Sequence, residues 1–220
     1  MTIPYVPEDL LQVGDYEVVS TDNNTLIVDN WYKNYDLLHS VLINTPAPRW
    51  KWSPGGRNFV DYYDCRPSLR INFPDKGKIQ QFFDSVCGLV SKHFSDAGPL
   101  RFEGEWLDFN FYKNKQQGVP NTLQHHPHKD YKYNCIVFLD QIASGGTAIY
   151  PKLTDLPDCE EQNLLMDVST FEKTIIPARP NRLVVFPGDQ YHGGYIENHD
   201  LYVDHWRMNQ VFFLDQPSSK

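Results

Sequence analysis

The chain has 220 residues, of which 40% are hydrophobic, and it carries a formal net charge of −8 at pH 7. Thirteen Tyr, thirteen Phe and five Trp can fill a large hydrophobic core, so the composition indicates one globular domain and excludes a disordered chain. The acidic balance and the lack of a Lys/Arg run disfavour nucleic acid as a partner, because surfaces that bind phosphate are usually basic.

The N-terminus and the cysteines indicate where the protein resides. Residues 1–9 have no basic segment followed by an apolar one, so we expect neither a signal peptide nor a membrane span. The cysteines are scattered, without the paired spacing of a zinc site, and they are Cys65, Cys87, Cys135 and Cys159. We interpret them as reduced thiols of a cytoplasmic protein. The sequence carries no signal for an oligomeric state.

The first hundred residues predict two helices and one short strand. Residues 25–28 read as a strand, after which Asp29 or Asn30 can cap a helix over residues 31–43, where apolar residues recur at helical spacing. Residues 78–94 carry a single apolar stripe, which is typical of a helix that packs on a sheet. We therefore expect a helical N-terminal part that covers a core made elsewhere in the chain.

From residue 105 onward the pattern predicts strands separated by Gly and Pro turns. Residues 105–112 alternate in polarity, and the polar face of this strand consists of Asp108, Asn110 and Tyr112. Further strands are predicted at residues 135–139, 144–150, 174–177, 181–186 and 201–214. This order predicts a single, mainly β domain with flanking helices, in which residues 1–104 pack on a β-sandwich or barrel formed by residues 105–214.

Three irregular segments interrupt these elements, at residues 46–66, 113–124 and 151–173. Long loops of this kind often form lids or binding edges, although they can also cover the core as ordinary surface loops. The side chains of the first loop that could line an entrance are Trp50, Trp52, Arg57, Tyr62 and Tyr63. Substrate selectivity would reside in these loops, so the sequence does not identify the substrate.

A His-x-Asp motif, His128 and Asp130, has the residue types of a metal site. In an extended backbone, residues i and i+2 point to the same side, and His192 follows a Pro-Gly-Asp bend that could fold it back onto this pair. Two imidazoles and one carboxylate can hold Fe(II) on one face of an octahedron and leave the other face open. Surface histidines in a polar loop are the alternative. His126 could replace His128, although Pro127 disfavours the helix that this spacing needs.

Arg207 is a basic residue in an otherwise apolar and aromatic strand. A guanidinium suits the bidentate capture of a carboxylate, and a buried charge without a partner is very unfavourable. An organic acid could be that partner. A pair with Asp204 or Asp108, or simple exposure to solvent, is the structural alternative.

Together these residues resemble the Fe(II)/2-oxoglutarate dioxygenases, and the prolyl-4-hydroxylase-like branch is the most similar. The resemblance covers residues 105–214, and the matching motifs in chain order are His128-x-Asp130, Gly145-Gly146-Thr147, the strand Arg182-Leu183-Val184-Val185-Phe186, His192 and Arg207. The interval from His192 to Arg207 is longer than the family pattern and requires an inserted turn at residues 197–200. His205 and Arg182 therefore compete with Arg207 for its role.

The resemblance implies a double-stranded β-helix, also called a jelly roll or cupin-like fold. It implies that His128, Asp130 and His192 are the catalytic metal ligands for Fe(II), with 2-oxoglutarate and O₂ as co-substrates. Arg207 would bind the distal carboxylate of 2-oxoglutarate. Further contacts to the co-substrate or to the metal ligands are expected from Tyr112, Asn110 and Thr147.

The activity implied by the resemblance is hydroxylation of an amino acid or a peptide side chain, with release of succinate and CO₂. The substrate would be a small molecule or a peptide. Related halogenases lack the carboxylate that Asp130 provides, which favours hydroxylation or demethylation. Three alternatives remain open: another cupin-type mononuclear iron enzyme, a nucleic-acid demethylase, and a non-catalytic binding module of the same fold.

Overall fold

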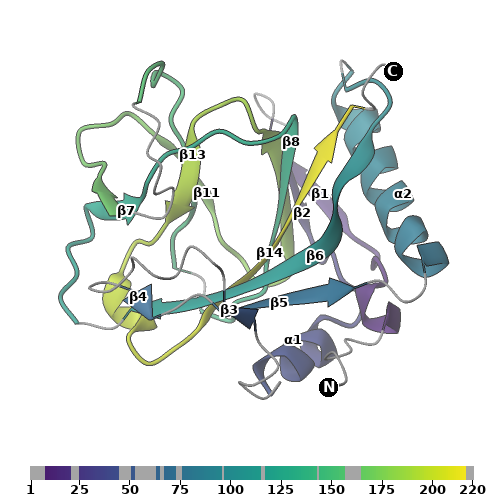
Figure 1. Ribbon diagram of the computed structural model, residues 1–220, viewed down its shortest axis with the longest axis horizontal. Helices are drawn as coiled ribbons and strands as arrows, with labels where there is room; N and C mark the ends of the chain where they lie inside the picture. The colour runs from purple at the N-terminus through teal and green to yellow at the C-terminus, as the bar shows by residue number, and fades with distance from the viewer. Residues whose placement is uncertain are drawn as a thin grey trace.

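The computed structural model describes residues 8–20, 25–44, 51–52, 63–64, 67–72, 76–95, 97–114, 117–142, 144–156 and 165–216. Two β layers face each other, and α2 lies along the outer side of the larger one (Figure 1). The helices are α1 (Tyr35–Ile43), α2 (Lys76–His93) and the short 3₁₀ helices η1 (Glu8–Leu11) and η4 (His199–Tyr202). No helix within the described ranges is long and apolar enough to cross a membrane.

The larger sheet has nine strands among the described residues, and the N-terminal part of the chain contributes to both of its edges. Its order is β1 (Glu17–Ser20), β2 (Leu26–Asp29), β12 (Arg182–Pro187), β8 (Tyr133–Phe138), β14 (Arg207–Asp215), β6 (Arg101–Asn114), β5 (Pro67–Asn72) and β3 (Lys51–Trp52), while β4 (Tyr63–Asp64) also pairs with β6. A smaller sheet has the order β11 (Thr174–Pro177), β9 (Gly146–Ile149), β13 (His192–Tyr195), and β10 (Leu165–Asp167) pairs with β7 (Leu123–His125).

Alternation along β8 separates two hydrophobic clusters. Cys135 and Val137 face the helices and join the core formed with α1 and α2. Ile136 and Phe138 point the other way, into a second cluster between the two sheets. Asn134 is two residues before Ile136 on β8, so its side chain also points into the space between the two sheets.

Most predicted elements are present, and three of them differ in their starts by four residues or more. The strand predicted from residue 105 is β6, which begins at Arg101. The helix predicted over residues 31–43 begins at Tyr35, because the carbonyl oxygens of Trp31 and Tyr32, which a longer helix would use, accept instead from the Gly14 N–H and from Asn181 Nδ2. Asn34 occupies its N-cap without a side-chain bond, so the predicted cap at Asp29 or Asn30 is wrong.

The strand predicted over residues 201–214 begins at Arg207. The first two residues of the predicted strand, 201 and 202, belong instead to η4, and residues 203–205 form a bend. The side chain of Asn198 caps η4 by accepting from the backbone N–H of Asp200. This short helix lies where the sequence required an inserted turn.

The predicted inward and outward faces of β6 agree with the structure where side chains are described. Phe109 and Phe111 are buried in the core beside the helices. The side chains of Asp108, Asn110 and Tyr112 lie outside the described part of the chain. The same holds for the side chains of the proposed entrance residues in the first loop. Cys87 and Cys135 are free thiols, in agreement with the prediction, and the other two cysteines are outside the described residues.

Candidate metal centre

His128, Asp130 and His192 come together at one edge of the space between the sheets. One potential ligand atom from each residue lies within 4.8 Å of the other two. Asp130 Oδ2 is 3.5 Å from His128 Nε2 and 3.3 Å from His192 Nε2. Within the described residues, the sequence-distant histidine thus meets the His-x-Asp pair, as the sequence predicted.

Backbone pairing holds the two segments together. His128 and His192 exchange both of their backbone hydrogen bonds, with N–O distances of 2.9 and 3.0 Å. Two residues on, the N–H of Asp130 donates to the carbonyl oxygen of Gly188 at 2.8 Å. A Cβ on Gly188 would lie 1.8 Å from the carbonyl oxygen of Tyr131, so only glycine permits this close approach. The local geometry of the candidate ligands therefore depends on two chain segments about sixty residues apart.

Both histidines are oriented by backbone carbonyls. His192 Nδ1 lies 2.8 Å from the carbonyl oxygen of Gln190, and His128 Nδ1 lies 3.0 Å from that of His126. A carbonyl oxygen only accepts hydrogen bonds, so each Nδ1 carries a proton and donates it. In each neutral ring the unprotonated Nε2 then points toward Asp130 with its lone pair, which is the arrangement that metal-ligating histidines usually have.

The protonation states that suit a metal follow from burial and from the neighbouring charges. Burial raises the pKa of Asp130, but the rings of His128 and His192 lower it by more when a proton lies on Nε2, so the net shift is downward and the group is a carboxylate at neutral pH. Burial lowers the pKa of His192 more than the Asp130 contact raises it, so His192 is neutral. The ring of Phe186 packs edge-on against His192 and contributes to that burial.

The donor set fits a cation. The carboxylate oxygen of Asp130 and the two Nε2 lone pairs are all electron-pair donors, and they converge within van der Waals distance. Such an arrangement is unfavourable unless a proton or a metal ion lies between them. Two imidazoles and one carboxylate are the ligand set of mononuclear non-haem Fe(II) sites with open coordination positions. The residues present therefore fit Fe(II).

Asn134 belongs to the same cluster, and sequence reasoning missed it. It is 2% exposed, and its Nδ2 lies 2.6 Å from His192 Nε2 and 3.2 Å from Asp130 Oδ2. Its Oδ1 is buried without a hydrogen-bond partner. A polar residue at an inward position of an apolar strand, four residues after Asp130, was the signal available in the sequence.

The other histidines of the motif have supporting positions. His126 uses its carbonyl oxygen to orient His128, and it is His128 that joins the cluster. The ring of His125 lies edge-on to that of His128, with centroids 5.1 Å apart. The i, i+2 spacing predicted for His128 and Asp130 is thus the one the structure uses.

Arg207 lies in the same inner space, at the other end of β13. It is 4% exposed, and its Nη2 donates to the carbonyl oxygen of Gly146 at 2.9 Å. Its guanidinium is 6.0 Å from the ring centroid of Phe138, and Nη1 is 3.7 Å from where a Cβ on Gly194 would be. Gly194 is two positions after His192 on the same strand, which is roughly 7 Å along the strand and on the same face.

The competitors of Arg207 have other places. Arg182 forms a buried ion pair with Asp29, donating from Nε at 2.6 Å and from Nη2 at 2.9 Å, so its role is structural. His205 is exposed, in a bend before β14. Of the three candidates, Arg207 is therefore the one that reaches the inner space.

The three remaining predicted residues can be placed on strands near Arg207. Thr147 is 2% exposed on β9, in register with Gly194 of β13. Tyr112 is the partner of Arg207 in the pairing of β6 with β14, and Asn110 is the partner of Asn209. The side chains of Tyr112 and Asn110 are outside the described part of the chain.

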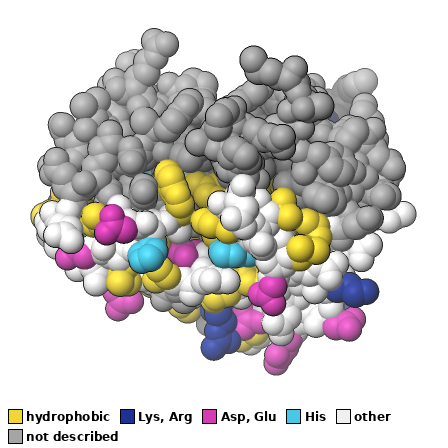
Figure 2. Space-filling view, turned by 90° about the horizontal axis from the view of Figure 1, so that it is seen from below, with side chains coloured by type: hydrophobic (Ala, Val, Ile, Leu, Met, Phe, Trp, Pro, Cys, Tyr) yellow, Lys and Arg dark blue, Asp and Glu magenta, His cyan; other side chains and the backbone are white. Residues whose placement is uncertain are grey.

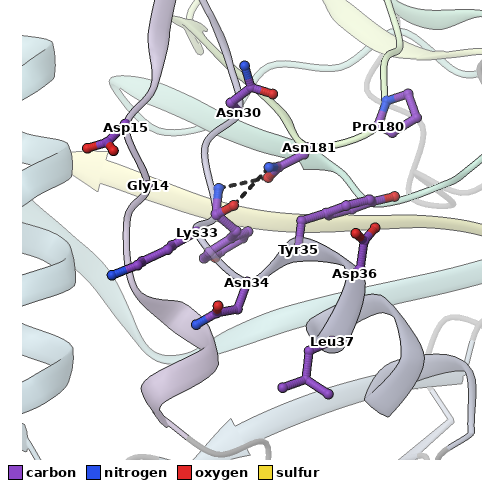
Figure 3. A pocket seen from close by; sticks show the side chains of 11 residues that line it. Gly14, Asp15, Asn30, Lys33, Asn34, Tyr35, Asp36, Leu37, Pro180 and Asn181 are labelled. Atoms are coloured by element: carbon purple, nitrogen blue, oxygen red, sulfur yellow. Dashed lines mark hydrogen bonds between the residues drawn. The ribbon is translucent and has the colours of Figure 1, made fainter.

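A separate hollow of about 710 Å³ lies at the far end of β12, lined among others by Lys33, Asp36 and Asn181 (Figure 3). The side chain of Asn181 is occupied there by hydrogen bonds with the backbone of Tyr32. Since β12 runs from Arg182 to Pro187, this hollow is roughly 20 Å from the candidate metal centre.

Solved structures with a similar fold include proteins that bind 2-oxoglutarate or depend on it. HygX from Streptomyces hygroscopicus, a structure with nickel and 2-oxoglutarate bound, is 12% identical, with a TM-score of 0.55 and coverage of 89% of this chain and 84% of HygX. An oxidoreductase of the 2OG-Fe(II) oxygenase family from Burkholderia pseudomallei is 11% identical, with a TM-score of 0.53 and coverage of 87% and 84%. The non-haem α-ketoglutarate-dependent epimerase SnoN from nogalamycin biosynthesis is 11% identical, with a TM-score of 0.52 and coverage of 88% and 79%.

No protein-family model and no curated protein matches the sequence. At 11–12% identity the structural similarities define the fold, which is the predicted double-stranded β-helix with flanking helices. The predicted likeness to the 2-oxoglutarate/Fe(II) oxygenase superfamily is confirmed at the level of the fold. These neighbours do not single out the prolyl-4-hydroxylase-like branch.

Proposed function

We propose that this protein is an Fe(II)- and 2-oxoglutarate-dependent oxygenase, in which His128, Asp130 and His192 hold the iron. The observation that carries the proposal is the convergence of one carboxylate and two oriented imidazole lone pairs within 4.8 Å. Bound Fe(II), together with 2-oxoglutarate and O₂, would supply the oxidising power, with succinate and CO₂ as co-products. The protein would supply ligand geometry and a space shielded from water.

Arg207 is the proposed partner of the distal carboxylate of 2-oxoglutarate. Its guanidinium faces the same inner space as His192 and is separated from it by roughly two strand residues, about 7 Å, a gap that an extended five-carbon diacid can span. Burial strengthens the attraction between a guanidinium and a carboxylate, since less water screens the charges. Thr147, Tyr112 and Asn110 are proposed as further contacts on the strands that flank Arg207.

Anaerobic titration with Fe(II) and 2-oxoglutarate tests this assignment, because the chelate of the two has a visible charge-transfer band. We expect the band in the parent protein and its loss in His128→Ala and His192→Ala. Arg207→Ala should keep the band but require at least about tenfold more 2-oxoglutarate, the loss expected for a charge-assisted hydrogen bond. His93→Ala is the matched control, since His93 only bonds the carbonyl oxygen of Leu89 in α2. A band that survives in His192→Ala would refute the site.

Hydroxylation of an amino acid or a peptide side chain is the proposed reaction. With iron bound, the carboxylate of Asp130 would take the coordination position that a halide needs, which supports oxygenation over halogenation. The test measures succinate formation with free amino acids and with short peptides as separate arms, and one arm should raise it above the substrate-free rate. Iron binding without any 2-oxoglutarate band would instead indicate another cupin-type iron enzyme.

Nucleic acid is not the proposed substrate, and the cytoplasm is the proposed location. On the face drawn in Figure 2, the described Lys and Arg side chains are scattered and do not gather into a basic patch. Cys87 and Cys135 are free thiols, which supports a reducing compartment.

A further inference from the structure

Asn134 is the one amide side chain that contacts two of the proposed iron ligands, within the described residues. It is the second residue of β8 and 2% exposed, so bulk water does not reach it. The amide nitrogen lies 2.6 Å from His192 Nε2 and 3.2 Å from Asp130 Oδ2, while the amide oxygen is buried without a partner. A buried polar atom without a partner is unfavourable, and a catalytic role or a missing ion is one of the explanations for such an atom.

The orientation of this amide follows from its neighbours. His192 donates from Nδ1 to the carbonyl oxygen of Gln190, so its Nε2 is an acceptor. Oδ2 of Asp130 accepts from the Asn134 amide at 3.2 Å, as a carboxylate oxygen does. The amide nitrogen of Asn134 must therefore face both groups, and its two hydrogens go to the same two atoms that an iron ion would bind.

A metal ion changes these two contacts differently. His192 Nε2 has a single lone pair, so it cannot accept from Asn134 and coordinate an ion at the same time. A carboxylate has lone pairs to spare, so Asp130 can coordinate an ion and still accept from Asn134. Metal binding therefore has to break the bond of Asn134 to His192 while the bond to Asp130 can persist.

We propose that Asn134 is a positioning residue of the iron site, an inference that rests on the proposed function. In the ion-free protein its amide nitrogen occupies the lone pairs of His192 and Asp130. When an ion binds, Asn134 releases His192, holds Asp130 in its ligating orientation, and turns Oδ1 toward a hydrogen-bond donor that arrives with the ion. Partners of this kind, one step removed from the metal, typically change its affinity 10–100-fold.

Side-chain NMR of the full chain tests the release of His192 directly, with Zn(II) as a diamagnetic probe. The NH₂ resonance pair of Asn134 is assigned by its absence from the spectrum of Asn134→Leu. We expect this pair to shift on addition of Zn(II) to the parent protein. A pair that stays unchanged while Zn(II) saturates the site would overturn the proposal.

Metal affinity tests the positioning role. Asn134→Leu keeps a similar shape but removes both the bond that metal binding has to break and the bond that holds Asp130. We expect loss of the second to dominate, so this variant should bind Zn(II) and Co(II) 10–100-fold more weakly without a fall in melting temperature, and equal or tighter binding would refute the positioning role. Gln210→Leu is the matched control, because Gln210 is a fully buried amide on the helix-facing side of the same sheet, where it accepts from Tyr32. It should leave metal affinity unchanged.

The outcomes separate the two proposals. If the parent protein binds no metal, or binds it equally well as His192→Ala, the proposed iron site fails. If the parent binds metal and Asn134→Leu binds it with the same affinity and the same Co(II) spectrum, only the role of Asn134 fails.

Discussion

The substitution Gly188→Ala perturbs the metal centre without changing any proposed ligand. A Cβ at this position would lie 1.8 Å from the carbonyl oxygen of Tyr131, whereas ordinary Cβ contacts begin at 3.4 Å. The two segments would therefore have to separate by about 1.6 Å, the difference of these two distances. The segment that must move carries Asp130.

The magnitude follows from the hydrogen bonds at this contact. Asp130 N–H donates to Gly188 O at 2.8 Å, and Gly188 N–H donates to Lys132 O at 2.9 Å. A separation of this size breaks both bonds, which contribute roughly 0.5–1.5 kcal/mol each, so we expect a loss of about 1–3 kcal/mol. For a chain of this length, that loss lowers the melting temperature by roughly 2–12 °C. Displacement of Asp130 should also weaken metal binding at least about tenfold.

The assay combines thermal unfolding with Co(II) titration, and the chain offers a control with the opposite sign. Gly88 lies in α2, and no atom lies within 4 Å of the position that a Cβ would take there, so Gly88→Ala should stabilise by up to about 1 kcal/mol through higher helix propensity. It should leave Co(II) affinity unchanged. If Gly188→Ala melts and binds Co(II) like the parent, the close approach of these two segments is refuted.

Three further outcomes are expected away from the metal centre. Asp29→Asn should lower the free energy of unfolding by about 3–5 kcal/mol, measured in urea, because it leaves the buried guanidinium of Arg182 without its carboxylate. The hydrogen bond from Arg182 holds the pKa of Asp29 below its ordinary value of 3.8, so its contribution is complete above that pH and is lost as the pH falls below it. The parent should therefore lose more stability than Asp29→Asn between about pH 4 and pH 2, and equal losses would contradict this. Burial raises the pKa of Cys135, so mass mapping after an iodoacetamide pulse should find it unmodified until urea unfolds the chain.

Much of the candidate site could be predicted from local pattern. The i, i+2 spacing of His128 and Asp130 puts both side chains on one side of an extended backbone, and the structure uses that spacing. The alternation in β6 placed Phe109 and Phe111 on the core face, and the apolar stripe of α2 predicted a helix packed on a sheet. These features depend on residues only a few positions apart, so the sequence carries them directly.

Choices between similar residues were decided by tertiary structure. Arg182 and Arg207 both begin β-strands, and the sequence left their roles open. Arg182 pairs with Asp29, which is 153 residues away in the chain, and Arg207 reaches the inner space beside Gly146. The start of α1 was likewise moved by the bonds that the carbonyl oxygens of Trp31 and Tyr32 accept from Gly14 and Asn181.

By itself, the amino-acid sequence determined the strand and helix periodicity, the spacing of two candidate ligands and the acidic character of the chain. Only the folded structure decided that His192 meets them and that Asn134 lies against two of the three. The physical reason is that periodicity is a property of neighbours along the chain. The meeting of β8 with the 188–192 segment depends instead on strand register, where a slip of one residue would turn Asn134 to the opposite face.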